Sequence, residues 1–185
     1  MNILLLGGIG SGKSLALEIL RDKYCANIIE ADKVAHFLYE KGQRGYSALV
    51  KLFGENILDN EKNIDRKKLG DILYFDKEKL EEVNSLIHPM VMDEIKKRLK
   101  GGLNVVEQAP LPDGSIDYDD IWYLYSDMDV RVERLILSRG LERERIIQII
   151  SKQPTEDEYR SFANRVIENN GDMKELEIGL REALR

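Results

Sequence analysis

Residues 7–14 read "GGIGSGKS", and this spacing of glycine, lysine and serine fits the pattern G-x-x-x-x-G-K-[ST] in full. Glycines let a ligand approach the main chain and tolerate positive φ, so successive N–H groups can turn inward. A short apolar run, residues 3–6, precedes the segment, and apolar residues at helical spacing follow it. This context is typical of a loop that holds the phosphates of a nucleotide in front of a helix.

The individual residues of this loop have distinct expected roles. The ammonium group of Lys13 is expected to reach the β- and γ-phosphates of ATP, and the hydroxyl of Ser14 is expected to ligate Mg²⁺. ATP and Mg²⁺ are therefore the predicted cofactors, and a glycine-rich turn with a solvated lysine is the structural alternative. The predicted nucleotide-binding residues are Gly8, Ile9, Gly10, Ser11, Gly12, Lys13, Ser14 and Leu15.

Asp32 ends a second short apolar segment, residues 27–32. We expect this segment to form a parallel strand beside the strand that leads into the glycine loop, which places Asp32 at the sheet edge where ligands bind. A carboxylate there can orient an acceptor hydroxyl and accept its proton during phosphoryl transfer. An N-cap of the next helix is the structural alternative. The chain lacks both N/T-K-x-D and D-x-x-G, so a small-molecule kinase is favoured over a GTPase.

The remaining sequence alternates strand and helix patterns. Buried-type strands are expected at 103–108, 120–126 and 165–169, and the charged stretch 33–100 is helical in pattern. The fold class is α/β: a P-loop kinase-like parallel sheet with helices on both faces, a helical insertion and a short helical lid. Residues 1–185 are expected to form a single domain. Helices are expected at 33–41, 44–53, 66–75, 77–87, 89–100, 129–139, 142–152, 155–163 and 172–184, with Asp65 and Asp76 as N-caps.

Composition limits the possible partners. The formal charge is −6 and the pI is about 5.2, which disfavours binding of nucleic acids or of anionic membranes. No apolar stretch approaches the length of a membrane span, and the only cysteine, Cys25, suits a reducing compartment. We therefore expect a cytoplasmic protein that binds small molecules, without nucleic acid, membrane or an obligate protein partner.

Seven segments carry a resemblance to a known family: "LLGGIGSGKS", "IIEADKVAH", "NIDRKKL", "NSLIHPMV", "VVEQAPL", "RVERLILSRG" and "ANRVIENNG". In order and spacing they resemble the dephospho-CoA kinases, and the resemblance spans residues 3–180. It implies ATP-dependent phosphorylation of the ribose 3′-hydroxyl of dephospho-coenzyme A to give coenzyme A. It also implies that residues 33–100 bind the acceptor and that a mobile lid covers about 138–154.

The resemblance also implies roles for single residues. Asp32 matches the carboxylate proposed to act on the acceptor hydroxyl, and Arg139 matches the lid arginine that contacts the transferring phosphates. Lys13, Asp32 and Arg139 are thus the expected catalytic residues, and Gly140 is a plausible hinge. The alternative for Arg139 is a solvated helix face. The expected contacts to the acceptor are Asp32, His36, Arg66, His88 and Pro110.

One of the expected acceptor contacts has a structural alternative: His88 precedes Pro89, so it can instead fix a local turn at a helix start.

Two alternatives to this function remain open. The chain also departs from the family pattern at "PLPDG", residues 110–114. The alternatives are another nucleoside- or nucleotide-type small-molecule kinase, for which residues 33–100 are the discriminating feature, and a nucleotide-binding module that has lost phosphoryl transfer.

Overall fold

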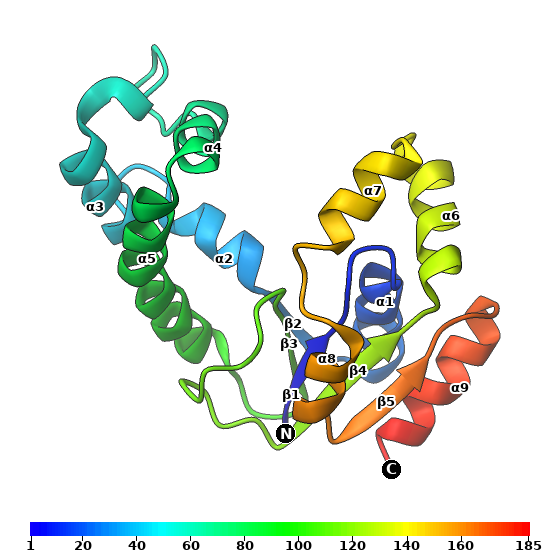
Figure 1. Cartoon of the computed structure of the whole chain (residues 1–185). Helices are drawn as coiled ribbons and strands as arrows, with labels where there is room; N and C mark the ends of the chain where they lie inside the picture. Colours follow the sequence, from blue (N-terminus) through cyan, green and yellow to red (C-terminus); the bar gives the residue numbers. More distant parts are fainter. The chain divides into compact units, whose positions relative to one another are not determined.

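Five parallel strands form one sheet in the order β2-β3-β1-β4-β5 (Figure 1). The structure is a computed structural model that describes all residues, 1–185. The central strand β1 is buried on both faces, and its residues Ile3–Leu6 have no exposed surface, as expected for a continuous apolar strand in a parallel sheet. The strands are β1 (Asn2–Leu6), β2 (Asn27–Glu30), β3 (Asn104–Glu107), β4 (Asp120–Tyr125) and β5 (Arg165–Glu168).

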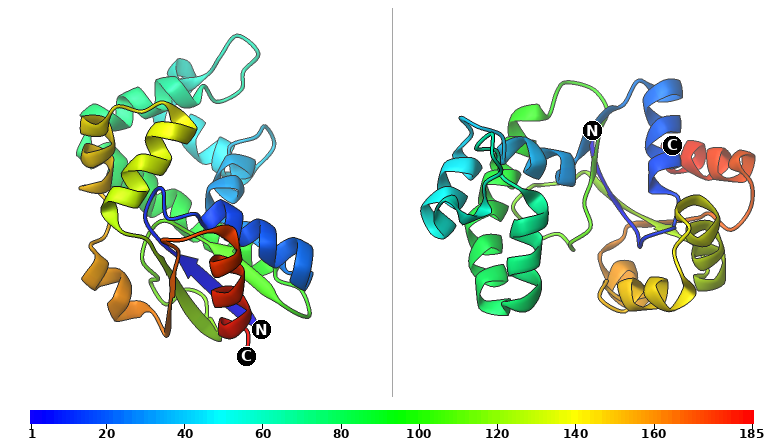
Figure 2. Two further views of the ribbon diagram at one scale, coloured as in Figure 1. Left: turned by 90° about the vertical axis from the view of Figure 1, so that its right-hand side faces the viewer. Right: turned by 90° about the horizontal axis from the view of Figure 1, so that it is seen from above.

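Helices cover both faces of the sheet, as the sequence predicts. Helices α1 (Lys13–Tyr24) and α9 (Met173–Ala183) pack against one face, where Trp122 and Leu124 of β4 point. On the opposite face, Tyr123 of β4 stacks on Tyr159 of α8 (Glu156–Phe162), with ring centroids 5.0 Å apart. Figure 2 shows α9 and α8 on opposite sides of the strands. Alternate residues of β4 thus serve two separate cores.

The strand order corrects one expectation. Asp32 was expected to end a strand, 27–32, beside the strand that leads into the glycine loop, but β2 ends at Glu30 and pairs only with β3. Strand β3 lies between them and pairs with β1, so that Leu5 is in register with Glu107. The chain leaves the sheet after β2 and returns as β3 between β2 and β1, and local sequence patterns do not encode this order. The carboxylate at the end of the strand next to β1 is therefore that of Glu107.

The chain divides into two compact units. One, here called the sheet unit, comprises Met1–Glu30 and Leu99–Arg185; the other, the helical unit, comprises Ala31–Arg98. No helix in the structure combines the length and the apolar character needed to cross a membrane. The helical unit contains α2 (Ala31–Leu38), α3 (Arg44–Phe53), the 3₁₀ turn η1 (Gly54–Ile57), α4 (Arg66–Phe75) and α5 (Lys77–Arg98).

Helix α5 is continuous for 22 residues and contains Pro89 in its interior. The sequence predicted two helices, 77–87 and 89–100, because proline lacks the N–H group that an interior helical position uses. That prediction is wrong at the break. Val83, Ile87 and Val91 are buried along one face of α5 on both sides of the proline, and this packing holds the two halves in line.

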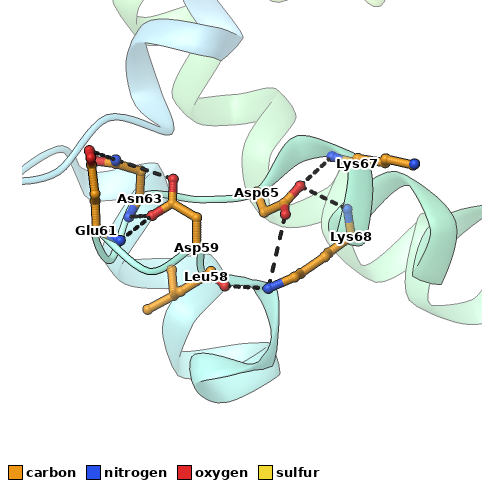
Figure 3. A network of polar contacts seen from close by, with 7 residues as sticks. All are labelled: Leu58, Asp59, Glu61, Asn63, Asp65, Lys67 and Lys68. Carbon is orange, nitrogen blue, oxygen red and sulfur yellow. Dashed lines mark hydrogen bonds and ion pairs between the residues drawn. The ribbon is translucent and has the colours of Figure 1, made fainter.

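Two aspartates cap helices of the helical unit, as predicted. The Asp65 carboxylate accepts the N–H groups of Lys67 and Lys68 at 3.0 and 3.1 Å, at the start of α4 (Figure 3). Asp76 accepts the N–H of Lys79 at 3.0 Å, and this bond lowers the pKa of the Asp76 carboxyl. Both caps satisfy N–H groups that have no acceptor within their helix.

In the sheet unit, α6 (Met128–Arg139) and α7 (Arg143–Ile150) form a helical hairpin. Gly140 ends α6 with a φ of 62°, and its N–H donates to the Ile136 carbonyl at 2.9 Å. Val132 and Leu135 of α6 form a small buried cluster with Ile146 of α7. The hairpin therefore has its own core, separate from the core beneath α1 and α9.

Candidate active site

The glycine loop lies between the carboxyl end of β1 and the start of α1. Gly12 precedes the helix with a φ of 92°, a backbone conformation that favours glycine. A Cβ atom on Gly12 would also come within 2.3 Å of the amide nitrogen of Asn169. Because the first N–H groups of α1 have no acceptor within the helix, the loop presents main-chain donors together with the positive end of a helix dipole. This is the geometry of a phosphate site.

Lys13 is held at the mouth of this loop. Its Nζ atom donates to the Gly7 carbonyl at 2.7 Å and lies 3.6 Å from Oε1 of Glu107. Both side chains of the ion pair are only about one-sixth exposed, at 15% and 16%. Glu107 is the last residue of β3, so the pairing of β3 with β1 is what places this carboxylate next to the loop. The partly buried pair fixes the ammonium group at the sheet edge where the phosphates of a nucleotide are expected.

Ile9 is clamped through its main chain by two side chains from the α6–α7 region. The Ile9 N–H donates to Oε1 of Gln153 at 2.9 Å, and the Ile9 carbonyl accepts Nε of Arg131 at 2.8 Å. Arg131 also donates from Nη2 to the same Gln153 oxygen at 3.1 Å. Burial of this guanidinium lowers the pKa of Arg131. A Cβ on Gly8 would lie 2.3 Å from Arg131 Nη2, so a larger residue at position 8 would displace this guanidinium.

The other side of the loop is held by residues that follow β4 and β5. The Ser11 carbonyl accepts Nδ2 of the buried Asn169 at 2.8 Å and the hydroxyl of Ser126 at 3.3 Å. Arg134 of α6 donates to the Ser126 hydroxyl oxygen at 3.1 Å. The loop is therefore anchored at Ile9 and at Ser11 before any ligand binds, which reduces the ordering cost of binding.

In the helical unit, helix α2 carries three polar residues at intervals of four and three positions. Asp32 lies in its first turn and His36 in its last, and both side chains are exposed. Tyr39 continues the helical turn, because its N–H donates to the Ala35 carbonyl at 3.2 Å. Burial, and to a lesser degree the charge of Asp32, raises the pKa of Tyr39. Residues spaced in this way share one face of a helix.

Arg66 opens α4 and lines a pocket of about 450 Å³ together with His36 and Tyr39. The structure thus brings together two of the residues predicted to contact the acceptor, His36 and Arg66. Asp32 lies four residues before His36 on the same helix. Arg66 is exposed.

Comparison with known proteins identifies the family. A sequence profile described as dephospho-CoA kinase matches residues 1–175. The dephospho-CoA kinase of Aquifex aeolicus is 37% identical over 177 residues, which cover 92% of this chain and 89% of that protein. The dephospho-CoA kinase of Lactobacillus johnsonii is 34% identical over 188 residues, covering 97% of this chain and 94% of that protein. The chain belongs to the dephospho-CoA kinase family.

Solved structures share the fold of this chain. A crystal structure from Thermus thermophilus is 27% identical, has a TM-score of 0.80 and covers 100% of this chain and 96% of that one. The dephospho-CoA kinase from Campylobacter jejuni, at 22% identity and a TM-score of 0.70, shares the fold over 99% of this chain and 94% of its own. As a member of the dephospho-CoA kinase family, the protein is a kinase that uses ATP and transfers a phosphoryl group to a hydroxyl group.

The other residues expected from the family pattern lie in different settings. Arg139 is the exposed last residue of α6, immediately before Gly140. His88 is half-buried inside α5, so it does not fix a turn before a new helix. Pro110 is exposed in the connection that follows β3, and its carbonyl accepts Nε2 of Gln108 at 3.2 Å.

Sequence reasoning missed two contacts of the phosphate loop and underrated a third. Gln153 and Asn169 were not singled out, although both bond the main chain of the loop. The sequence predicts that Glu107 ends the third strand and acts through Mg²⁺-bound water or as an outer-shell group, with a solvated side chain as the alternative, but it does not predict the ion pair with Lys13. Its position at the end of an apolar strand was a usable signal, because carboxyl ends of parallel strands share one edge of the sheet. Neither amide stands in a local pattern that indicates a role in the loop.

Proposed function

We propose that this protein transfers the γ-phosphoryl group of ATP to the ribose 3′-hydroxyl of dephospho-coenzyme A, yielding coenzyme A and ADP. The observation that carries the proposal is the pre-formed phosphate loop, with Lys13 held by Glu107 and Gly7, in a chain that matches the family profile over residues 1–175. The intact loop opposes the alternative of a binding module that has lost transfer.

The reaction assigns one role to each part of the site. The amides of the loop and the start of α1 bind the phosphates, and Lys13 neutralises charge on the β- and γ-phosphates. Asp32 orients the 3′-hydroxyl and accepts its proton as the new O–P bond forms. The bond from the γ-phosphorus to the β,γ-bridging oxygen breaks, and ADP leaves. Arg139 stabilises the charge that spreads over the equatorial oxygens in the transition state.

We propose that Mg²⁺ accompanies ATP. The hydroxyl of Ser14 in the first turn of α1 and the half-buried Glu107 carboxylate are oxygen donors of the kind Mg²⁺ prefers. No group of three or more metal-binding side chains occurs in the structure, which fits an ion held mainly by phosphate oxygens and water. When bound, the ion would supply positive charge that offsets the negative charge of the phosphates.

Two further assignments belong to this proposal. Residues 33–100 bind the acceptor, and about 138–154 act as a lid whose closure excludes water from the transferring phosphate. A cytoplasmic location, with small molecules as the only required partners, suits a chain with a single cysteine and an acidic average charge.

An acceptor panel tests the proposal. The protein is incubated with Mg·ATP and, in separate reactions, with dephospho-coenzyme A, adenosine, AMP or pantetheine, and ADP release and product mass are measured. Coenzyme A from the first acceptor, without comparable product from the others, is the expected result. ADP formation with a different acceptor selects another small-molecule kinase, and ATP binding without any turnover selects a module that has lost catalysis.

A further inference from the structure

The pocket of the helical unit combines positive charge with neutral hydrogen-bonding groups. It lies where the end of α2, the loop before α4 and the start of α4 meet, and its volume is about 450 Å³. Lys41 and Arg66 bring two full positive charges, and Glu40 brings one negative charge. The lining residues are His36, Tyr39, Glu40, Lys41, Asn63, Ile64 and Arg66.

The loop that forms one wall is held in place by its own polar contacts (Figure 3). One oxygen of the Asp59 carboxylate accepts the N–H groups of Glu61 and Asn63 at 2.9 and 2.8 Å, and the other accepts Nδ2 of Asn63 at 3.3 Å. These bonds lower the pKa of the Asp59 carboxyl. Lys41 donates from Nζ to the Glu61 carbonyl, which ties the end of α2 to the loop. Asn63 and Lys41 are thus fixed at the pocket before a ligand binds.

Several donors remain available to a ligand in this pocket. The side chains of His36 and Arg66 form no hydrogen bond and no ion pair in the structure, and both are exposed. The α4 amides at Lys67 and Lys68 are already bonded to the Asp65 carboxylate, so an anion here would be held by side chains rather than by the helix N-terminus. Tyr39, whose pKa is raised, keeps its phenolic proton and can donate it.

The pocket lies near the end of α2, whereas Asp32, the residue proposed to act on the acceptor hydroxyl, lies in the first turn of the same helix. Asp32 and Tyr39 are seven positions apart, which corresponds to about 10 Å along a helix that rises 1.5 Å per residue. In dephospho-coenzyme A, the 5′-diphosphate is separated from the 3′-hydroxyl by the ribose ring and one methylene group. If the 3′-hydroxyl of the acceptor contacts Asp32 and the acceptor lies along α2, its diphosphate comes close to His36 and Tyr39. Lys41 and Arg66 lie in the same pocket.

We infer that this pocket binds the 5′-diphosphate of the acceptor, with Lys41 and Arg66 as its charged contacts and Tyr39 as a neutral hydrogen-bond donor. The inference rests on the proposed function, because it names the part of the acceptor that the helical unit recognises. A diphosphate is favoured over the neutral pantetheine arm, since the two cations outnumber the single carboxylate of the pocket.

The test uses the full chain and removes one charge at a time. Lys41→Gln and Arg66→Gln each delete a proposed contact, Lys41→Arg restores the charge at position 41, and Lys51→Gln deletes an exposed lysine of α3 outside the pocket. KM for dephospho-coenzyme A, KM for ATP and kcat are measured at low and at high salt. Thermal unfolding of each variant verifies that it is folded.

The expected result is a rise of about tenfold or more in KM for dephospho-coenzyme A in Lys41→Gln and in Arg66→Gln, because each loses a charge-assisted hydrogen bond. KM for ATP stays the same, Lys41→Arg recovers most of the affinity, and Lys51→Gln behaves as the unmodified protein. Salt raises KM for dephospho-coenzyme A less steeply in the two Gln variants than in the unmodified protein.

Two outcomes would overturn the inference. One is an unchanged KM for dephospho-coenzyme A in both Gln variants. The other is a raised KM with the salt dependence of the unmodified protein, which would assign the pocket to the neutral arm. If the unmodified protein forms no coenzyme A, the proposed function itself fails, and this is known before any variant is compared.

Discussion

Replacing Gln153 with leucine removes the hydrogen bonds of this side chain but keeps its approximate size. One amide oxygen of Gln153 accepts both the Ile9 N–H, at 2.9 Å, and the Arg131 guanidinium, at 3.1 Å. Leucine has a similar size and no acceptor, so both donors lose their partner in a half-buried setting. In this variant the glycine loop keeps the hydrogen bond from Asn169 to Ser11 and the bond from Arg131 to Ile9, but it loses the bond from the Ile9 N–H to Gln153.

The size of the effect follows from these two bonds. A neutral hydrogen bond contributes about 1 kcal/mol, and a bond to a charged group about 1.5–3 kcal/mol. Both donors are only partly buried, so water can replace part of the loss, and about 2 kcal/mol is a reasonable sum. If ATP binds only to the clamped loop, this sum corresponds to a rise of about 30-fold in KM for ATP.

Steady-state kinetics with ATP and the acceptor varied separately provide the assay. Gln153→Leu should raise KM for ATP while KM for dephospho-coenzyme A changes little, because the bonds of Gln153 go to Ile9 and Arg131 at the glycine loop. Gln153→Glu keeps an acceptor oxygen for both donors and should stay within a few-fold of the unmodified protein. Gln148→Leu, on the exposed surface of α7, is the control for added apolar surface. Equal KM values for ATP in Gln153→Leu and Gln148→Leu would refute the role of the clamp.

Three other variants or conditions test separate parts of the structure. Asp32→Asn should leave ATP affinity nearly unchanged and reduce turnover severely, and normal turnover would remove this carboxylate from the mechanism. Asp120 is buried and bonds Nε of Arg165 at 2.6 Å, so Asp120→Ala should lower the free energy of unfolding by about 2–3 kcal/mol in a urea titration. Burial raises the pKa of Tyr118 and of Tyr159 to about 12, from 10.0. The two tyrosines therefore contribute fully to stability below pH 10, and this contribution is lost as the pH rises toward 12. A free energy of unfolding that stays constant between pH 10 and pH 12 would contradict this prediction.

The sequence predicts most elements of this fold because their signals are local. The bounds of α3 and α4 agree with the predicted helices to the residue, and the cap at Asp65 is confirmed by its bonds to two backbone amides. The break predicted at Pro89 is wrong, because burial on both sides of the proline outweighs one missing N–H bond. Local propensity therefore predicts the helix bounds correctly where tertiary packing favours the same conformation.

Strand order and the anchors of the glycine loop depend on contacts between distant parts of the chain. Glu107 lies far from Lys13 in the sequence, and only the placement of β3 beside β1 brings the two together. Gln153 reaches Ile9 across 144 positions, and Asn169 reaches Ser11 across 158. A motif identifies the loop itself, since its glycines and lysine are adjacent in sequence. It does not identify the residues that hold the loop, because these come from separate elements of the fold.

The same contacts restrict how the α6–α7 hairpin can move. Ile9 packs against the cluster formed by Val132, Leu135 and Ile146, while its N–H and carbonyl are bonded to Gln153 and Arg131. A swing of the whole hairpin would break the cluster and both bonds at once. Within the proposed lid, about 138–154, closure that carries Arg139 inward is therefore expected to bend only the tip near Gly140, whose φ of 62° already lies outside the helical range. Hydrogen exchange checks this: the Ile9 and Ile146 amides should keep their protection when ATP binds, whereas a whole-hairpin swing would change both together.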